Sequence, residues 1–319
     1  MKVVMINDCA FVGETLLRYL PADVEKQHIK RSRGWWSKTF GIAYKIARAK
    51  ADVYHAHYLL QDCYIAARLG KKPLVGHAHG SDLRRQLRSR KWGWIVRSNL
   101  KNCGKILVAQ PTILAAAREY NETAEYFPIP FDPKTFFPKP LNAGRKKKHV
   151  LLASAHDFAV KGTDKFLKAV ASVSKTPITV KSIGSGKDLE LAKQLAKELG
   201  IKIEFIPRVQ HEKMNELYWD SDLVLGSFGV GQLDTVAIEA MACGRPVVHS
   251  VYKEFFPGCP LEQIESVEDS ANLISVLLTE EDKVQKRVAT QLDYVNTRHS
   301  APLLSEKLIK IYTDLTANR

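Results

Sequence analysis

The sequence predicts an α/β protein with two doubly wound, parallel-sheet domains. Short apolar, β-branched runs alternate with longer segments of helical periodicity along the whole chain. Because parallel strands need a return connection of a dozen or more residues, this alternation indicates parallel sheets with crossover helices. The pattern occurs twice, and a length of 319 residues suits two domains of about 150 residues better than one core.

Nine runs have the length and composition of buried strands. They lie at residues 3–6, 53–57, 73–77 and 105–108 in the first half, and at 150–154, 178–183, 202–206, 223–226 and 246–249 in the second. Helical periodicity fills most of the intervals, for example over 164–173, 188–199 and 236–242. A last helix, at about 302–315, has no strand after it.

The segment 136–148 separates the two series, and its prolines, glycine and basic run indicate a linker. We therefore expect an N-terminal domain over residues 1–140 and a C-terminal domain over residues 146–299. Ligands of doubly wound sheets bind beyond the carboxyl ends of the strands, so we expect the site in a cleft between the domains.

The composition is that of a globular protein, with 45% apolar and 26% charged residues. No run approaches the roughly 20 apolar residues that span a bilayer, and the first residues lack the pattern of a secretion signal. The five cysteines are scattered and lack the close pairs of a zinc site. These features predict a cytoplasmic protein with reduced thiols.

The net charge of +14 lies entirely in the first half of the chain. Residues 1–145 carry 25 basic and 11 acidic side chains, whereas residues 146–319 carry 23 of each. Two segments without any acidic residue concentrate the charge: residues 26–50, which include Trp35 and Trp36, and residues 84–101, which include Trp92 and Trp94.

Three interpretations of these basic segments stay open: solvated helix faces, contact with nucleic acid, or contact with an anionic membrane. Each Lys or Arg near an anionic leaflet contributes roughly 1 kcal/mol to adsorption, and tryptophan favours the headgroup zone. Because the rest of the chain carries no nucleic-acid-binding module, we favour the membrane.

The strongest local motif is LDTVAIEAMACGRPVV, at residues 233–248. It predicts a helix that carries Glu239, ends at Gly244 and leads into a buried strand. Asp234 or Thr235 can cap the start of this helix, where backbone N–H groups and the helix dipole favour an anion such as a diphosphate. The alternative is an ordinary strand–helix–strand unit with a cap.

This segment resembles the signature of the retaining glycosyltransferases of family 4, which runs E-x7-E and continues A-M-A-x-G-x-P-V-V. Six further segments resemble family motifs in the same order: DVYHAH (52–57), KPLVGHAHGSDL (72–83), IPFDPKTFFP (129–138), VKGT (160–163), IGSG (183–186) and FIPRVQH (205–211). The resemblance implies a GT-B fold, in which two Rossmann-like domains face a cleft. It also implies that the C-terminal helix, about residues 300–319, crosses back to the N-terminal domain.

The resemblance assigns roles to individual residues. Glu239 matches the glutamate that binds the ribose hydroxyls of the donor, and Lys161 matches the lysine that neutralises its diphosphate, where charge grows as the glycosidic bond breaks. His79 matches a histidine that approaches the sugar. Gly184 and Val209 match backbone contacts to phosphate and base.

Gly13, in the first strand-to-helix turn, allows the backbone to approach the sugar phosphate. The sequence departs from the family pattern at three positions. The first glutamate of E-x7-E is replaced by Gly231, and we expect Asp234 to take its place at the sugar, with Gln232 as the alternative. The arginine that usually precedes the lysine is replaced by His156, which we expect to donate to a phosphate of the donor in a pH-dependent way. One glycine of the first loop is also missing.

The sequence thus predicts a retaining, metal-independent hexosyltransferase without a cofactor, with a UDP- or GDP-sugar as co-substrate. We expect His79, Lys161 and Asp234 to act in catalysis. The acceptor is expected to be a polyprenyl-phosphate-linked sugar, a glycolipid or another glycan at the cytoplasmic face of a membrane. Asp220-Ser221-Asp222 is interpreted as a helix end and strand start rather than a metal site.

The alternatives are a nucleotide-sugar epimerase of GT-B architecture, a non-catalytic nucleotide-sugar-binding protein, and, as the least favoured, a nucleic-acid-binding protein. An epimerase needs no acceptor and releases an altered nucleotide sugar. A non-catalytic protein binds the donor without hydrolysis or transfer, as the missing glutamate suggests.

Overall fold

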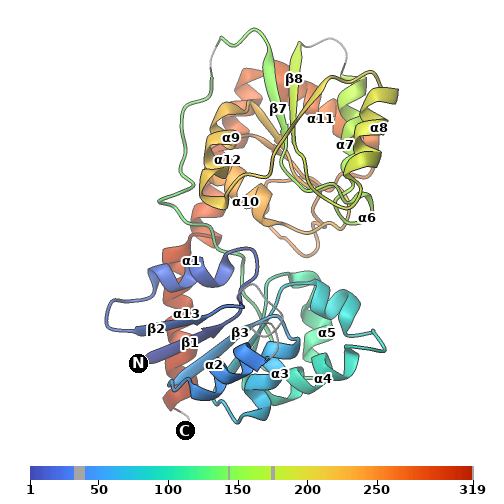
Figure 1. The fold of residues 1–319 in the computed structure, drawn as a ribbon. Helices are drawn as coiled ribbons and strands as arrows, with labels where there is room; N and C mark the ends of the chain where they lie inside the picture. The colour runs from blue at the N-terminus through green and yellow to red at the C-terminus, as the bar shows by residue number, and fades with distance from the viewer. Residues whose placement is uncertain (32–39, 143, 174–176, 318–319) are drawn as a thin grey trace. The chain divides into compact units, whose positions relative to one another are not determined.

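The computed structural model describes residues 1–31, 40–142, 144–173 and 177–317, and the chain divides into two compact units. Unit 1 comprises Met1–Pro130 and Ser300–Arg319, and unit 2 comprises Phe131–His299. Figure 1 shows that each unit is a sheet covered by helices. The predicted α/β fold with two doubly wound parallel sheets is confirmed.

The sheet of unit 1 has six parallel strands in the order β2-β1-β3-β4-β5-β6. Their bounds are β1 Lys2–Ile6, β2 Glu25–Ile29, β3 Val53–His57, β4 Leu74–Ala78, β5 Lys105–Val108 and β6 Glu125–Tyr126. The helical segments are α1 Val12–Tyr19, α2 Ile42–Arg48, α3 Gln61–Arg68, η2 Asp82–Gln86, α4 Gly93–Asn102, η3 Pro111–Ile113, α5 Leu114–Arg118 and α13 Ala301–Ala317.

Side-chain alternation along the strands divides the core of unit 1 between two faces. On β3, Tyr54 and Ala56 pack into the core beneath α2, α3, α4 and α5. Val53 packs into the second core, beneath α1 and α13, together with Leu308 and Tyr312 of the last helix. Because alternate residues of a strand share a face, His55 and His57 also face α13.

The sheet of unit 2 has five parallel strands in the order β11-β10-β7-β8-β9. Their bounds are β7 Lys148–Leu152, β8 Ile178–Ile183, β9 Ile203–Ile206, β10 Leu223–Leu225 and β11 Val247–Val248. The helical segments are α6 Phe158–Lys161, α7 Thr163–Ser172, α8 Leu189–Glu198, η4 His211–Lys213, α9 Met214–Asp220, α10 Thr235–Ala242, α11 Val267–Thr279 and α12 Glu281–Arg298. Helix α7 packs against α11, and α10 packs against α9 and α12.

All nine expected strands are present within two residues of their expected positions, and two more strands, β2 and β6, were not predicted. Both lie at the edges of the unit 1 sheet. The first three residues of β2 are exposed, so this strand lacks the apolar run that identifies a buried one.

The expected linker at 136–148 is wrong at its start, because this stretch already packs on unit 2. Phe136 is fully buried, and the carbonyl groups of Lys139 and Pro140 accept hydrogen bonds from Arg245. The chain passes between the units at Pro130 and again at His299. The last helix, α13, belongs to unit 1, as the resemblance implied.

The basic residues of the segment 84–101 are all exposed: Arg84, Arg85, Arg88, Arg90, Lys91, Arg97 and Lys101. The large aromatic side chains of Phe40, Tyr44 and Trp94 are also exposed. Helix α3 packs against both α2 and α4, which carry Tyr44 and Trp94. Trp35 and Trp36 lie outside the described residues. Among the residues that the structure describes, every helix is too short or too polar to span a bilayer.

Candidate active site

The loops that follow the strands of unit 2 carry most of the predicted site residues. Lys161 follows β7, Gly184 follows β8, the half-buried Val209 follows β9, and Asp234 follows β10. Every strand pair in this sheet is parallel, so the carboxyl ends of the strands meet at one edge. The structure therefore brings these segments to the edge where doubly wound sheets bind ligands.

Lys161 and Asp234 form an ion pair, with the Nζ of the lysine 2.6 Å from Oδ2 of the aspartate. Lys161 ends the short helix α6, whose start is capped by Asp157 through a hydrogen bond from the N–H of Val160. The N–H of Phe228 donates to the carbonyl of Lys161 at 2.7 Å. This bond joins the turn after β7 to the loop after β10, which carries Asp234.

Two glycines permit the close approach of these two segments. Gly162 has a φ of +61°, and a Cβ there would lie 2.9 Å from Cβ of Phe228. A Cβ at Gly229 would lie 2.3 Å from the carbonyl oxygen of Val160. A larger residue at either position would push the loops apart, so the contact between Lys161 and Asp234 depends on both glycines.

Asp234 also caps helix α10, because its Oδ1 accepts the N–H of Ala237 at 3.1 Å. Burial opposes ionisation, but the ammonium of Lys161 holds the pKa of Asp234 below its ordinary value. The site therefore combines a lysine ammonium with the start of α10 at Thr235. An ammonium beside the first N–H groups of a helix suits a phosphate ligand.

Glu239, in the second turn of α10, is buried and already has two partners. The Nε2 of His211 lies 2.5 Å from its Oε1, and the hydroxyl of Tyr218 donates to its Oε2 at 3.3 Å. Burial raises the pKa of Glu239, and these two hydrogen bonds oppose that shift. The ring of Phe136 packs on His211 with centroids 5.3 Å apart. Each oxygen of this carboxylate therefore already accepts one hydrogen bond within unit 2.

His249, which sequence reasoning did not single out, fixes the loop that leads to Asp234. The N–H of Ser227 donates to its Nδ1 at 2.8 Å, and its Nε2 lies 2.7 Å from the carbonyl of Gln232. Because Nδ1 accepts a hydrogen bond, the proton of the neutral ring is on Nε2. Burial lowers the pKa of His249, which keeps it neutral. No motif in the sequence distinguishes this histidine from an ordinary core residue.

Two of the expected phosphate contacts are engaged within unit 2 itself. The fully buried His156 has its Nε2 2.9 Å from Oγ of Ser182 and its Nδ1 3.4 Å from Oγ1 of Thr163. Burial lowers the pKa of His156. The N–H of Gly184 donates to the carbonyl of Ile206 at 2.7 Å. Both groups therefore support the loops in this structure.

Gly231 stands where the first glutamate of the E-x7-E pattern is expected, and its surroundings explain the replacement. It has a φ of +58°, and a Cβ there would lie 2.5 Å from Cγ of Tyr252. The N–H of Tyr252 donates to the carbonyl of Gly231 at 2.9 Å. The tyrosine ring, which is 40% exposed, therefore covers the position that a side chain at residue 231 needs.

In unit 1, His79 and Gly13 both lie against the imidazole of His57. The Nε2 of His79 is 2.9 Å from Nδ1 of His57. A Cβ at Gly13 would lie 2.8 Å from Nε2 of His57. The N–H of Gly13 donates to Oδ1 of Asp8 at 2.8 Å.

Three described histidines, His55, His57 and His77, have nitrogen atoms within 4.8 Å of one another and are the candidate ligands for a metal ion. The rings of His55 and His57 lie face to face, 4.7 Å apart and 8° from parallel. The nitrogen lone pairs of these two stacked rings lie in two nearly parallel planes, so they do not converge on one point. This arrangement therefore suits hydrogen bonding and stacking better than a shared metal ion.

The acidic pair Asp220 and Asp222 lies at the end of α9 and just before β10, as predicted. Arg145 contacts both carboxylates, at 3.1 and 3.2 Å, and Lys181 contacts Asp220 at 3.1 Å. Asp220 and Asp222 therefore belong to an ion-pair network with Arg145 and Lys181.

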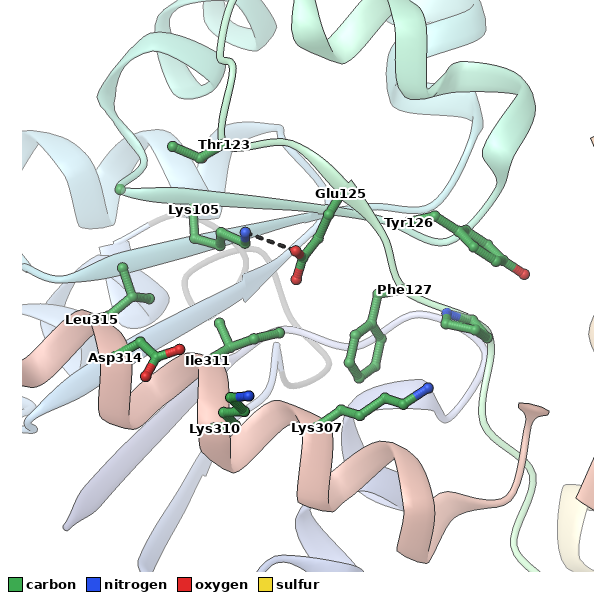
Figure 2. A pocket seen from close by; sticks show the side chains of 12 residues that line it. Lys105, Thr123, Glu125, Tyr126, Phe127, Lys307, Lys310, Ile311, Asp314 and Leu315 are labelled. Atoms are coloured by element: carbon green, nitrogen blue, oxygen red, sulfur yellow. Dashed lines mark hydrogen bonds and ion pairs between the residues drawn. The ribbon is translucent and has the colours of Figure 1, made fainter. Parts of the chain in front are cut away.

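Unit 1 also contains a groove of about 580 Å³ beside α13, shown in Figure 2. Phe127 lies on one side of it and Ile311 and Lys307 of α13 on the other. Lys105 and Glu125 in its wall pair at 2.9 Å. The groove contains none of the predicted site residues, and we assign it no part in the chemistry.

Residues 136–259 match the family model described as Glycosyl transferases group 1. The match begins at the buried Phe136 of unit 2 and includes Lys161, Asp234 and Glu239. The matched residues all lie within unit 2. A comparison with curated proteins gives no match.

Solved structures resemble the chain over its whole length. Sucrose-phosphate synthase from Thermosynechococcus elongatus has a TM-score of 0.79 at 15% identity, with 100% of each chain covered. HepE of Anabaena in complex with UDP-glucose has a TM-score of 0.76 at 15% identity, with 99% of this chain and 100% of that chain covered. The apo form of WaaB, a lipopolysaccharide outer core galactosyltransferase, has a TM-score of 0.67 at 12% identity, with the same coverage. These likenesses establish the GT-B fold.

Proposed function

We propose that this protein is a glycosyltransferase that transfers a hexose from a nucleotide sugar to an acceptor, and that unit 2 binds the donor. The observation that carries this proposal is the Lys161–Asp234 pair at the start of α10, within the matched domain. HepE, solved with UDP-glucose, supports a UDP-sugar as the first donor to test.

Lys161 is proposed to stabilise the departing diphosphate, with the first N–H groups of α10 at Thr235 as further donors. Before the donor binds, Asp234 holds the ammonium in place. The fixed ammonium supplies the cationic charge that a metal ion supplies in other transferases, so we propose a metal-independent reaction. Retention at the anomeric carbon is the stereochemistry that the family resemblance implies.

Glu239 is proposed to bind the ribose hydroxyls once His211 has moved from its Oε1. His79 stays the proposed contact to the transferred sugar, with Gly13 as a backbone contact. The engaged nitrogens of His156 favour a supporting role for this residue over direct contact with phosphate.

Calorimetry with UDP, GDP, ADP and TDP tests the donor site directly. We expect one nucleotide to bind, and Lys161→Ala to weaken it by at least about 10-fold, because a charge-assisted phosphate contact contributes about 1.5–3 kcal/mol. Lys168→Ala is the matched control, since this lysine is exposed on α7. A wild-type protein that binds none of the four nucleotides would refute the proposal.

For the acceptor, we propose a lipid-linked sugar or glycolipid at an anionic membrane surface. The exposed basic residues of 84–101 and the exposed rings of Tyr44 and Trp94 support this assignment. Vesicle flotation with and without anionic lipid tests it, with Arg85→Glu/Arg88→Glu as the variant. Equal flotation with neutral and anionic vesicles, or unchanged binding by the variant, would remove the membrane from the proposal.

Gly231 favours a second candidate, a nucleotide-sugar-binding protein without transferase activity, because the carboxylate expected at the sugar is missing. Incubation of a bound nucleotide sugar with lipid-linked sugar and glycolipid acceptors separates the candidates. Release of the nucleoside diphosphate supports the transferase, an altered nucleotide sugar indicates an epimerase, and an unchanged donor indicates the binding protein.

A further inference from the structure

Four histidines of β3 and β4 form an array on one face of the unit 1 sheet. The strand register pairs His57 with His77, and His55 precedes His57 by two residues on the same face. His79 continues the same alternation just beyond β4. His55, His57 and His77 are fully buried, and the hydroxyl of Tyr312 on α13 lies 2.6 Å from Nδ1 of His55.

His79 is held through both its backbone and its ring. The carboxylate of Asp82 accepts the N–H groups of His79 and Gly80, at 3.2 and 2.9 Å. The ring stacks on His77, with centroids 4.4 Å apart, and its Nε2 lies 2.9 Å from Nδ1 of His57. Within the described part of the chain, Nδ1 of His79 takes part in no hydrogen bond, so this nitrogen is the one available to a ligand.

The bond between His57 and His79 contains a single proton, because both rings are neutral. Burial lowers the pKa of His79 to about 3 and that of His57 well below its ordinary value. The proton lies either on Nδ1 of His57, which then donates, or on Nε2 of His79.

The other nitrogen of His57 decides between these two arrangements. Its Nε2 is buried and has no hydrogen-bond partner among the described residues. Buried donors without a partner are rarer in proteins than buried acceptors without one, because leaving an acceptor without a hydrogen bond costs less free energy. Nε2 of His57 is therefore unprotonated, and Nδ1 of His57 donates to Nε2 of His79. The neutral ring of His79 must then hold its own proton on Nδ1.

We propose that His57 is a positioning residue that holds His79 as the Nδ1-protonated tautomer, ready to donate a hydrogen bond to a substrate oxygen. In this form His79 serves as a donor to a sugar hydroxyl or phosphate oxygen and not as a general base. The role of this donor in transfer rests on the proposed function, whereas the tautomer itself is a property of unit 1 alone.

Nitrogen-15 NMR of histidine-labelled full-length protein tests the tautomer, with His79→Gln to assign the signals. We expect the Nδ1 of His79 to be protonated and unchanged between pH 6 and 8. A protonated Nε2 on His79 in the wild type would overturn the proposal.

Kinetics test the positioning role. His57→Phe keeps the ring stack but removes the donor, whereas His57→Asn places an amide N–H near the position of Nδ1. We expect His57→Phe to lower kcat by up to about 100-fold with little change in the donor KM, and His57→Asn to restore most of that loss. His55→Phe is the matched control, because it removes an equally buried imidazole of β3 that has no hydrogen bond to His79.

A loss in His57→Phe no greater than that in His55→Phe would refute the positioning role. If His57→Phe fails to fold, the comparison of His57→Asn with wild type and the NMR result still test whether His57 positions His79. A wild-type protein without transfer activity refutes the proposed function, and the tautomer is then judged by NMR alone.

Discussion

Gly231 is the position at which the sequence departs most from the glycosyltransferase pattern, and its geometry predicts a measurable cost for any side chain. We predict that Gly231→Ala destabilises unit 2 for two separate reasons. The first is the left-handed backbone, with φ at +58°. The second is overlap, because the new Cβ would lie 2.5–2.6 Å from three atoms of the Tyr252 ring.

The two contributions are similar in size. A left-handed conformation costs a non-glycine residue about 1–2 kcal/mol. Overpacking costs about 1–3 kcal/mol, and the exposure of the Tyr252 ring places this contribution toward the lower end, since the ring can turn into solvent. We therefore expect Gly231→Ala to lower the free energy of unfolding by about 2–4 kcal/mol.

Urea unfolding of four proteins measures both contributions: wild type, Gly231→Ala, Tyr252→Ala and the double variant. In the Tyr252→Ala background, Gly231→Ala should cost only the free energy of the backbone strain. The coupling energy between the two substitutions then equals the free-energy cost of the steric overlap. Gly200→Ala is the matched control, because Gly200 has a φ of +68° with nothing within 4 Å of the added Cβ. A cost at Gly231 equal to that at Gly200, or a coupling energy near zero, would refute the reasoning.

Two further predictions concern pH and the ribose. Burial lowers the pKa of His55 to about 3 and those of His57 and His77 well below their ordinary values, so only the unfolded chain binds protons there below about pH 6.5. Stability should then fall with decreasing pH by up to about 4 kcal/mol per pH unit for the three residues, and equal melting temperatures at pH 7.5 and 5.5 would contradict this. Glu239→Ala should weaken UDP binding by about 10-fold, yet leave the affinity for 2′,3′-dideoxy-UDP unchanged. Calorimetry with the two nucleotides tests this, and equal losses for both would exclude a ribose contact.

The fold followed from the sequence because buried parallel strands are nearly continuous apolar runs. The two strands that escaped prediction are those for which this physical reason fails. β2 has three exposed residues at the sheet edge, and β6 has only two residues. The start of the expected linker at 136–148 was predicted wrongly, because its composition suggested a connection where the chain is in fact packed. Its prolines indicated a connection, but the buried Phe136 anchors its beginning in unit 2.

The candidate site was predictable in its members but not in their pairing. Motifs identified Lys161 and Asp234 separately, whereas their ion pair joins residues 73 positions apart and depends on the fold. The partners of Glu239 were not predicted, because His211 and Tyr218 lie in a different loop and helix. The motif that identifies Glu239 contains no information about the imidazole of His211, which contacts its carboxylate.

The missing glutamate and the proposed substitute must be considered together. Asp234 was expected to replace the glutamate at the sugar, but both of its oxygens already have partners, the N–H of Ala237 and the ammonium of Lys161. Each oxygen has a second lone pair, so a sugar hydroxyl can bind Oδ2 beside the ammonium or in its place. When a diphosphate takes over the ammonium of Lys161, it frees Oδ2 of Asp234 while Oδ1 keeps its cap. Under the proposed function, donor binding therefore makes Oδ2 more accessible to the sugar, and we expect Asp234→Asn to weaken binding of the nucleotide sugar more than binding of the nucleoside diphosphate. Equal effects on both ligands, measured by calorimetry, would show that Asp234 serves only the cap and the lysine.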